Sequence, residues 1–228
     1  MKKLLIILSL CSFGESVLLA APCANTSNCS FTFTTPNGSS EFTGSNFGTV
    51  NLALQADKTI KFTIDLSSSS MKIWGNNGAF PGAFGFNDNS TTDTLTISGY
   101  TPAGYSGSAL NGGYPEFGTF DHIAAVNSPG QQMNGANLAS VVTFVVATNQ
   151  AGGFTDVNQL AQLTGSAYFV VHAFCPVASC GGAGKTGSIA ATAVVNTPEP
   201  SSYLAALGIG FLAMFIAVPL RRKKQPVN

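Results

Sequence analysis

The fold is decided by the stretch Gly48-Thr49-Val50-Asn51-Leu52-Ala53-Leu54-Gln55 and its continuation Thr59-Ile60-Lys61-Phe62-Thr63-Ile64-Asp65-Leu66, which are separated by Ala56-Asp57-Lys58. In each stretch the large apolar residues occupy every second position. Period-two alternation on both sides of a short polar turn predicts a hairpin of two half-buried antiparallel strands. One face of this hairpin carries Lys61, Thr63 and Asp65 toward solvent.

Further strands are predicted outside the hairpin, separated by clusters of Gly, Pro, Asn and Ser. The segment 141–146 is apolar on both faces, which predicts a central strand. The Gly- and Pro-rich segment 100–114 is predicted to be an ordered loop or an edge, and 158–163 a short helix. The fold class is therefore all-β, an antiparallel β-sandwich of jelly-roll or Ig-like type. The predicted additional strands are Gly82–Asn87, Thr92–Ser98, Gly118–Ala124, Ala139–Thr148, Ala167–Phe174 and Gly187–Val195.

The N-terminal segment is typical of a signal peptide. Met1-Lys2-Lys3 precedes an apolar run, and Leu18-Leu19-Ala20-Ala21 supplies small residues for cleavage. This pattern predicts a signal peptide over 1–21, export through the inner membrane, and a mature domain over 22–196. A lipoprotein signal would need a small residue before the lipid-accepting Cys, whereas Leu10 precedes Cys11 and Pro22 precedes Cys23.

The C-terminal segment is typical of a membrane anchor. The uncharged run 204–220 spans roughly 25 Å as a helix, within the range for a membrane-spanning segment. Arg221, Arg222, Lys223 and Lys224 follow it directly and are predicted to stop translocation at the inner membrane. A buried core helix would not end in four consecutive cations. We therefore expect a single transmembrane helix.

Pro198-Glu199-Pro200 stands just before this helix. The two prolines fix φ and hold the segment extended, as a recognition site requires. Together with the helix 204–220 and the basic cluster 221–224, the motif resembles the PEP-CTERM sorting signal, although Thr197 stands where the common form has Val. The resemblance covers the tail 197–228. It implies processing by an exosortase, a membrane-embedded cysteine transpeptidase-like enzyme, and a final location at the cell surface or outside the cell.

Two segments of the middle domain also look like recurrent motifs of ectodomains attached to this tail. They are Gly118-Thr119-Phe120-Asp121-His122-Ile123 and Gly187-Ser188-Ile189-Ala190-Ala191. Those ectodomains are functionally uncharacterised, so this likeness supports the domain limits and carries no function.

Four cysteines remain after removal of the signal peptide, an even number in an oxidising compartment. Four cysteines allow three connectivities, and the short loops favour Cys23–Cys29 and Cys175–Cys180. A metal site is the alternative, but the pairs lack C-x-x-C spacing and His partners. No cofactor is predicted.

Catalytic motifs are weak. Gly181–Thr186 lacks the first Gly of a phosphate loop and leads into a predicted strand. Asp121 and His122 are neighbours on a strand and point to opposite faces, so they cannot form a relay. His172 lies in an apolar strand and is interpreted as a core residue. Paired carboxylates for glycoside cleavage could arise in many ways among the acids of the domain. The expectation is that the chain is not an enzyme.

Two binding sites are considered. The oxygen-rich segment 87–93 offers Asp88 and Asp93 for calcium, but it lacks the pattern of an EF-hand loop, and turn chemistry explains its composition equally well. The aromatic residues Trp74, Tyr100, Tyr105 and Tyr114 are candidates for stacking on sugar rings, unless they belong to the core.

Charge and composition exclude few classes. Charged residues make up 9% of the chain, against roughly 25% in a typical soluble domain. Basic residues gather at the two ends, so the middle lacks the clustered positive face that nucleic acids require. The sequence thus favours a non-catalytic surface or matrix component. The alternatives are a carbohydrate-binding or adhesive module for exopolysaccharide and, third, a secreted hydrolase.

Overall fold

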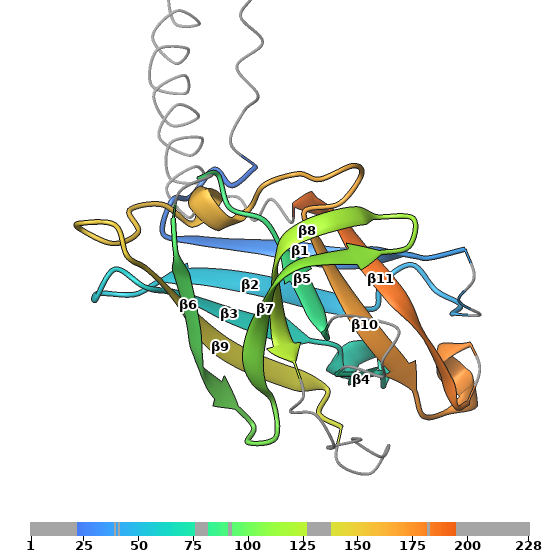
Figure 1. Ribbon diagram of the computed structural model, residues 1–228. Helices are drawn as coiled ribbons and strands as arrows, with labels where there is room; N and C mark the ends of the chain where they lie inside the picture. Colours follow the sequence, from blue (N-terminus) through green and yellow to red (C-terminus); the bar gives the residue numbers. More distant parts are fainter. Residues whose placement is uncertain are drawn as a thin grey trace, which may run out of the picture.

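The computed structural model describes residues 22–38, 40, 42–75, 82–90, 93–126, 138–181 and 183–194 (Figure 1). The predicted signal peptide 1–21 and the sorting tail 197–228, with its helix 204–220, lie outside the described residues. Within the described ranges, no helix has the length and apolar character needed to cross a bilayer.

One antiparallel sheet contains all the strands of the described residues. Its order is β6-β9-β3-β2-β1-β11-β10-β5-β8-β7, and β4 pairs separately with β10. The described residues also form the short 3-10 helices η1 (Ser67–Ser69), η3 (Val157–Leu160) and η4 (Ala178–Cys180). The strands are β1 (Asn28–Pro36), β2 (Gly48–Leu54), β3 (Ile60–Asp65), β4 (Lys72–Ile73), β5 (Phe84–Phe86), β6 (Leu95–Thr101), β7 (Ser106–Tyr114), β8 (Gly118–Val126), β9 (Val141–Thr148), β10 (Phe169–Cys175) and β11 (Lys185–Val194).

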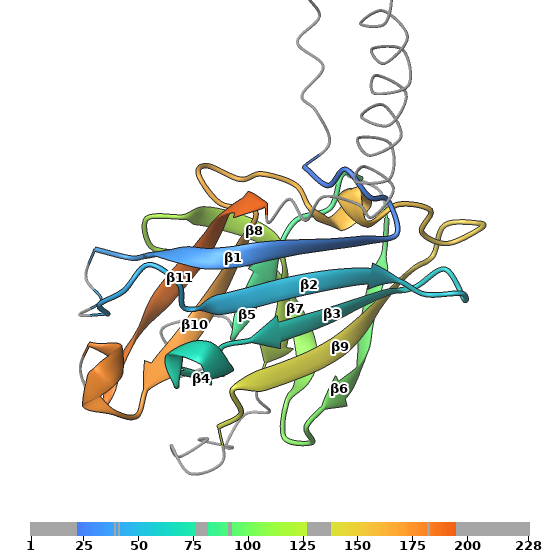
Figure 2. The ribbon, with the colours of Figure 1, turned by 180° about the vertical axis from the view of Figure 1, so that it is seen from behind.

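The sheet curls on itself, so that its two edge strands approach each other. β6 and β7 stand at opposite ends of the strand order, yet they follow one another in the chain (Figure 1). The Tyr100 hydroxyl of β6 donates a hydrogen bond to the carbonyl of Gly107 in β7. From behind, β1, β2, β3 and β9 form one layer across the molecule (Figure 2). The all-β antiparallel class is confirmed. The hydrogen-bonded path is one continuous sheet, and the jelly-roll or Ig-like subtype stays a prediction.

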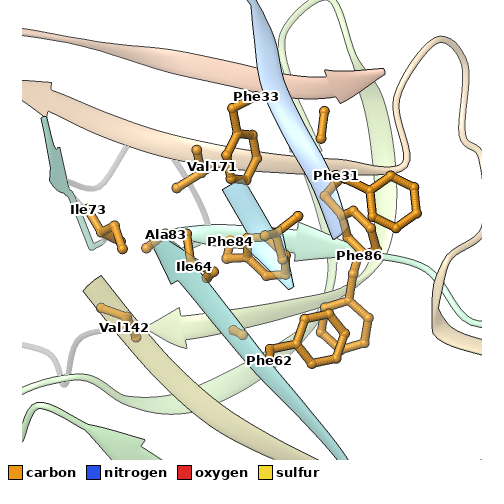
Figure 3. Close-up of a cluster of buried hydrophobic side chains, with 14 of the residues drawn as sticks. Phe31, Phe33, Phe62, Ile64, Ile73, Ala83, Phe84, Phe86, Val142 and Val171 are labelled. Carbon is orange, nitrogen blue, oxygen red and sulfur yellow. The ribbon is translucent and has the colours of Figure 1, made fainter. Parts of the chain in front are cut away.

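Phenylalanine fills the space inside the curl. The ring of Phe62 in β3 lies 5.0 Å from that of Phe144 in β9, centroid to centroid, and 5.2 Å from that of Phe86 in β5. Phe62, Phe84 and Phe86 point toward one another from strands of opposite layers, with Phe31 of β1 beside them (Figure 3). All these rings are fully buried. Offset and edge-to-face ring pairs add stabilisation beyond the area they bury.

A second, smaller cluster packs on the other face of β5 and β10. It requires Gly85, because a Cβ at this position would lie 2.8 Å from a Tyr114 ring atom, 2.9 Å from Val170 Cγ1 and 3.0 Å from Phe120 Cγ. The ladder β5–β8–β7 can therefore turn closely over β10. The cluster comprises Tyr114, Phe117, Phe120, Ile123, Ala167, Val170 and Ala190.

The predicted hairpin is confirmed in position and in register. β2 pairs with β3 through the turn 55–59, with Leu52 opposite Phe62 and Val50 opposite Ile64. The six other predicted segments all contain strands, namely β5, β6, β8, β9, β10 and β11. Gly181–Thr186 leads into strand β11 at Lys185, as expected.

Other local predictions need correction. The sequence did not predict β1, which pairs with both β2 and β11. The segment 100–114 contains the end of edge strand β6 and all of edge strand β7, so the edge alternative is correct. β9 is not central: it lies next to edge strand β6, and Val141 on its outer face is 38% exposed. The segment 158–163 contributes only the end of the 3-10 helix η3.

Two disulfides are formed, Cys23–Cys29 and Cys175–Cys180, in the pairing expected from the short loops. Cys23–Cys29 holds the chain at the start of β1, and Cys175–Cys180 closes the connection from β10 to β11. The N-terminal loop is held further by Asn158 in η3, whose side chain accepts from Cys23 N and donates to Cys23 O. The loop before β1 and the connection between β10 and β11 are therefore each held against the sheet by a disulfide.

Candidate functional site

A polar hollow lies between the segment that leads into β6 and the paired strands β7 and β8. We call it the seam hollow, because its lining comes from edge strand β7, from β8 and from the segment that leads into edge strand β6. Its volume is about 440 Å³. It is lined by Asp88, Asn89, Ser90, Asp93, Asn111, Asp121 and His122. Every lining residue is polar, and none is Lys or Arg.

Asp88 and His122 meet in this hollow because β5 pairs with β8. The register places Phe86 opposite His122, and Asp88 follows two residues after Phe86. The imidazole of His122 stacks on the Phe86 ring, with centroids 5.2 Å apart. This contact directs His122 Nε2 toward Asp88 Oδ2, at 3.3 Å. The side chains of His122 and Asp88 are only 10% and 6% exposed.

The electrostatics of the hollow disfavour a further negative charge. Burial raises the pKa of the Asp88 carboxyl, and this exceeds the lowering caused by His122. Asp121 and Asp93 raise the pKa of Asp88 further, because their carboxylates repel its charged form. The three carboxylates thus repel one another, and His122 is the only lining residue of a type that can carry a positive charge.

Asp93 anchors the segment that carries Asp88. Its carboxylate accepts from Ser90 Oγ at 2.7 Å, from Gln150 Nε2 at 2.6 Å and from Thr148 Oγ1 at 3.3 Å. These bonds, led by that of Ser90, lower the pKa of Asp93. On the other side of the hollow, Asn87 accepts from Asp121 N and donates to Thr164 Oγ1. The hollow is therefore built before any ligand arrives.

The C-terminal tail, outside the described residues, matches a known family model. Residues 196–222 match the model of the PEP-CTERM protein-sorting motif. The chain carries a PEP-CTERM sorting signal. It is thus an exported protein processed by exosortase. No curated protein matches this PEP-CTERM protein, and no solved structure does. The match begins two positions after the last residue of β11, Val194, so it carries no information on the hollow.

The calcium prediction is correct only in placing Asp88 and Asp93 together. Both residues line the seam hollow. The carboxylate oxygens of Asp93, however, already accept three hydrogen bonds from neutral donors. No group of three or more His, Cys, Asp or Glu side chains within the described part of the chain is arranged to hold a metal ion. The geometry gives the PEP-CTERM protein a polar hollow, without a coordination shell for calcium.

The sugar-stacking prediction is wrong for two of its four residues. Tyr105 and Tyr114 are 3% and 2% exposed, and their hydroxyls donate to the carbonyls of Ile73 and Gly82. Burial raises the pKa of Tyr105 to about 12. Trp74 and Tyr100 are half-buried, and Trp74 packs on Phe174 with ring centroids 5.0 Å apart. None of the residues that line the seam hollow is Trp, Tyr or Phe.

His172 is a fully buried core residue, as the sequence analysis interpreted it. Its backbone ties three segments together, since His172 N donates to Ala83 O and Trp74 N donates to His172 O. Its side chain lies on β10, and Ser188 is its partner residue on β11. Burial lowers the pKa of His172 to about 4, so the imidazole is neutral in the folded protein at pH 7.

His172 predicts a loss of stability in mild acid. The unfolded chain takes up a proton on this imidazole near pH 6.5, whereas the folded chain does so only near pH 4. The stabilisation of the folded state by the neutral His172 imidazole is therefore complete above pH 6.5 and is lost as the pH falls to 4. We expect this loss to lower the free energy of unfolding by about 3 kcal/mol over this window. Urea unfolding at pH 7 and pH 4 measures the change. His172→Gln should remove about that much of the pH dependence, and an unchanged slope would contradict the assignment.

The Asp88–His122 pair is the feature of the candidate site that sequence reasoning missed. The sequence analysis considered Asp121 for His122 and rejected it correctly, because neighbours on a strand point to opposite faces. The partner comes instead from the segment after β5, 34 positions earlier in the chain. The sequence placed Asp88 directly after one predicted strand and His122 within another. Only the pairing of those two strands, which the sequence did not predict, brings the two side chains together.

Proposed function

We propose that this PEP-CTERM protein is a non-catalytic component of the cell surface or extracellular matrix. One observation supports this proposal above the others: the sorting motif at 196–222 begins two positions after β11, which pairs with β1 and β10 inside the sheet. The folded domain is therefore joined to the sorting signal with almost no spacer. A domain attached in this way is positioned by the envelope and released or anchored as a unit.

The chain ends support the same role. Val194 at the end of β11 pairs with Phe31 near the start of β1. The N-terminal loop and the C-terminal exit therefore lie at the same end of the sheet (Figure 2). A domain held at the membrane through this end would expose the turn between β6 and β7, at the other end of β6, to the surroundings. Such an orientation suits a protein that contacts matrix outside the cell.

The non-catalytic part of the proposal is supported by the hydroxyl and thiol groups near the site. Ser90 is the hydroxyl residue in the lining of the hollow, and its Oγ donates to Asp93. The four cysteines that the structure describes are all in disulfides. His122 faces a carboxylate, which alone would orient an imidazole but supplies no nucleophile.

Intact-mass analysis of the protein recovered from the surface of its native host tests this proposal. We expect a mass that lacks both the predicted signal peptide 1–21 and the helix 204–220. Material from a host strain without exosortase serves as the control and should retain the C-terminal helix in the membrane fraction. A full-length C-terminus in wild-type surface material would reduce the tail to an ordinary single-pass anchor and contradict the proposal.

A second role, binding of exopolysaccharide, is favoured by the seam hollow. Carboxylates, amides and a hydroxyl gather there on a preformed frame, and such groups bind sugar hydroxyls in proteins. The volume of about 440 Å³ lies in the range of small-molecule pockets, roughly 300–1,000 Å³. In this role the hollow would hold the protein to the matrix after processing has freed it from the membrane. This role needs no catalysis.

A further inference from the structure

The seam hollow presents negative charge that its own lining does not balance. Asp88, Asp93 and Asp121 contribute carboxylates, and the lining contains neither Lys nor Arg. Asp93 is bonded to Ser90, Gln150 and Thr148, which are all neutral donors. Three carboxylates against one histidine leave the hollow negative at neutral pH. A ligand of opposite charge would be attracted to it.

A buried oxygen on Asp88 points to the same kind of ligand independently. The Asp88 side chain is 6% exposed, and within the described residues its Oδ2 contacts His122 Nε2 at 3.3 Å and no other donor. Asp121 and Asp93 also lie close enough for their carboxylates to repel that of Asp88. A carboxylate oxygen has two lone pairs, so Oδ2 can accept from a second donor besides His122. This acceptor belongs to the lining of the hollow, where an incoming donor would satisfy it.

The other lining groups define what surrounds that donor. Asn89 and Asn111 are exposed, and each side-chain amide both donates and accepts hydrogen bonds. Groups that do both are suited to hydroxyls, which also do both. The Phe86 ring stacks against His122, and neither forms an open platform for the apolar face of a sugar. Recognition would therefore depend on charge and hydrogen bonding, with little contribution from ring stacking.

We propose that the seam hollow binds an amino sugar with a free, protonated amine, presented within a glycan. The ammonium group supplies three donors for the carboxylates, with Asp88 Oδ2 as the central acceptor, and the ring hydroxyls bond to Asn89 and Asn111. N-acetylation would remove the charge and leave the carboxylates unbalanced. This inference rests on the proposed role in exopolysaccharide binding and names the sugar class.

Isothermal titration of the full chain in detergent with a glucosamine trimer tests the proposal, and the N-acetylated trimer is the comparison ligand. We expect the free-amine trimer to bind at least about tenfold more tightly. Its affinity should fall severalfold as salt is raised, because the contact is ionic. Asp88→Asn should weaken it at least about tenfold. Asp57→Asn, which removes the same charge from the exposed turn between β2 and β3, should leave it within about twofold.

The possible outcomes separate this inference from the role on which it rests. Equal affinity for the two trimers would overturn the amino-sugar assignment while leaving glycan binding in place. Binding of neither trimer at millimolar concentration would overturn both. Unchanged affinity in Asp88→Asn would also overturn the assignment. The folded state of each variant is checked by mapping Cys23–Cys29 and Cys175–Cys180 and by thermal unfolding. Asp88→Asn removes one partner of the buried pair with His122, so it should lower the stability of the fold, and its affinity is compared only once thermal unfolding shows that the variant is folded at the titration temperature.

Discussion

Gly48→Ala should abolish folding of the ectodomain or destabilise it by at least about 4 kcal/mol. Gly48 begins β2 with φ of 135°, a conformation that L side chains rarely adopt. A Cβ there would lie 2.0 Å from the carbonyl oxygen of Asp65 and 2.9 Å from Leu66 Cα. Both atoms belong to the backbone of the neighbouring strand and its end, so no side-chain movement relieves the clash. The β2–β3 hairpin and the β1–β2 pairing would both have to shift.

Gly152→Ala is the matched control for this prediction. Gly152 also has a positive φ, 92°, but nothing lies within 4 Å of the position its Cβ would take. It carries the conformational penalty of a side chain without the clash, which should be about 1–2 kcal/mol. Urea unfolding of the two purified variants and the wild type measures the difference, and soluble yield replaces it if Gly48→Ala does not fold. A loss in Gly48→Ala no larger than in Gly152→Ala would show that the backbone relaxes around the added methyl.

The parts of the fold that could be predicted are those whose information is local. The 48–66 hairpin combines period-two alternation with a short turn, so both its strands and their register follow from neighbouring residues. β7 could be predicted only as an ordered loop or an edge, because Gly107, Gly112 and Gly113 interrupt any alternation. β1 carries a detectable signal in Cys29, Phe31 and Phe33, but the residues between them are Ser and Thr, which also fill the loops of this chain.

Strand order was beyond a single sequence for a physical reason. β9 is apolar at nearly every position, and such a run normally indicates burial on both faces. Here Val141 is 38% exposed and Thr143 and Val145 are half-buried, because β9 is covered on one face only. β-branched residues are favoured in strands because they pack well on a pleated surface that is only half-buried, so they do not require burial on both faces. The composition of β9 therefore identifies a strand but does not place it within the sheet.

The candidate site depends on the same missing information. Asp88, Asn111 and His122 come from three segments that meet only when β5, β8 and β7 pair in sequence. No spacing rule connects an acid after one strand to a histidine in the middle of another. The disulfides and the sorting signal were accessible because each is encoded within a short stretch. Short local motifs thus predict how this protein is exported. The residues of its candidate binding site can be identified only from the paired strands of the folded sheet.

Glu199→Ala should block processing, so that the protein recovered from the host keeps its C-terminal segment 204–224. Glu199 is the only charged residue between Lys185 and Arg221. An enzyme that reads this extended segment beside the membrane would recognise the carboxylate through a basic group, and charge-assisted hydrogen bonds of this kind are the strong ones. We expect at least about tenfold less processed protein, with the remainder in the membrane fraction. An uncleaved helix would stay there, because burial of its apolar surface makes spontaneous release negligible.

Two further variants show which property of Glu199 matters. Ser201→Ala changes the same segment without changing charge, and it should be processed as the wild type. Glu199→Gln keeps the shape and the hydrogen-bonding oxygen but removes the charge, so it should resemble Glu199→Ala if a basic group in the enzyme is the partner. Intact-mass analysis of surface and membrane material distinguishes the three variants. Wild-type processing of Glu199→Gln would assign recognition to shape and hydrogen bonding. Wild-type processing of Glu199→Ala would leave the two prolines, which fix the extended backbone, as the part of the motif that the enzyme reads.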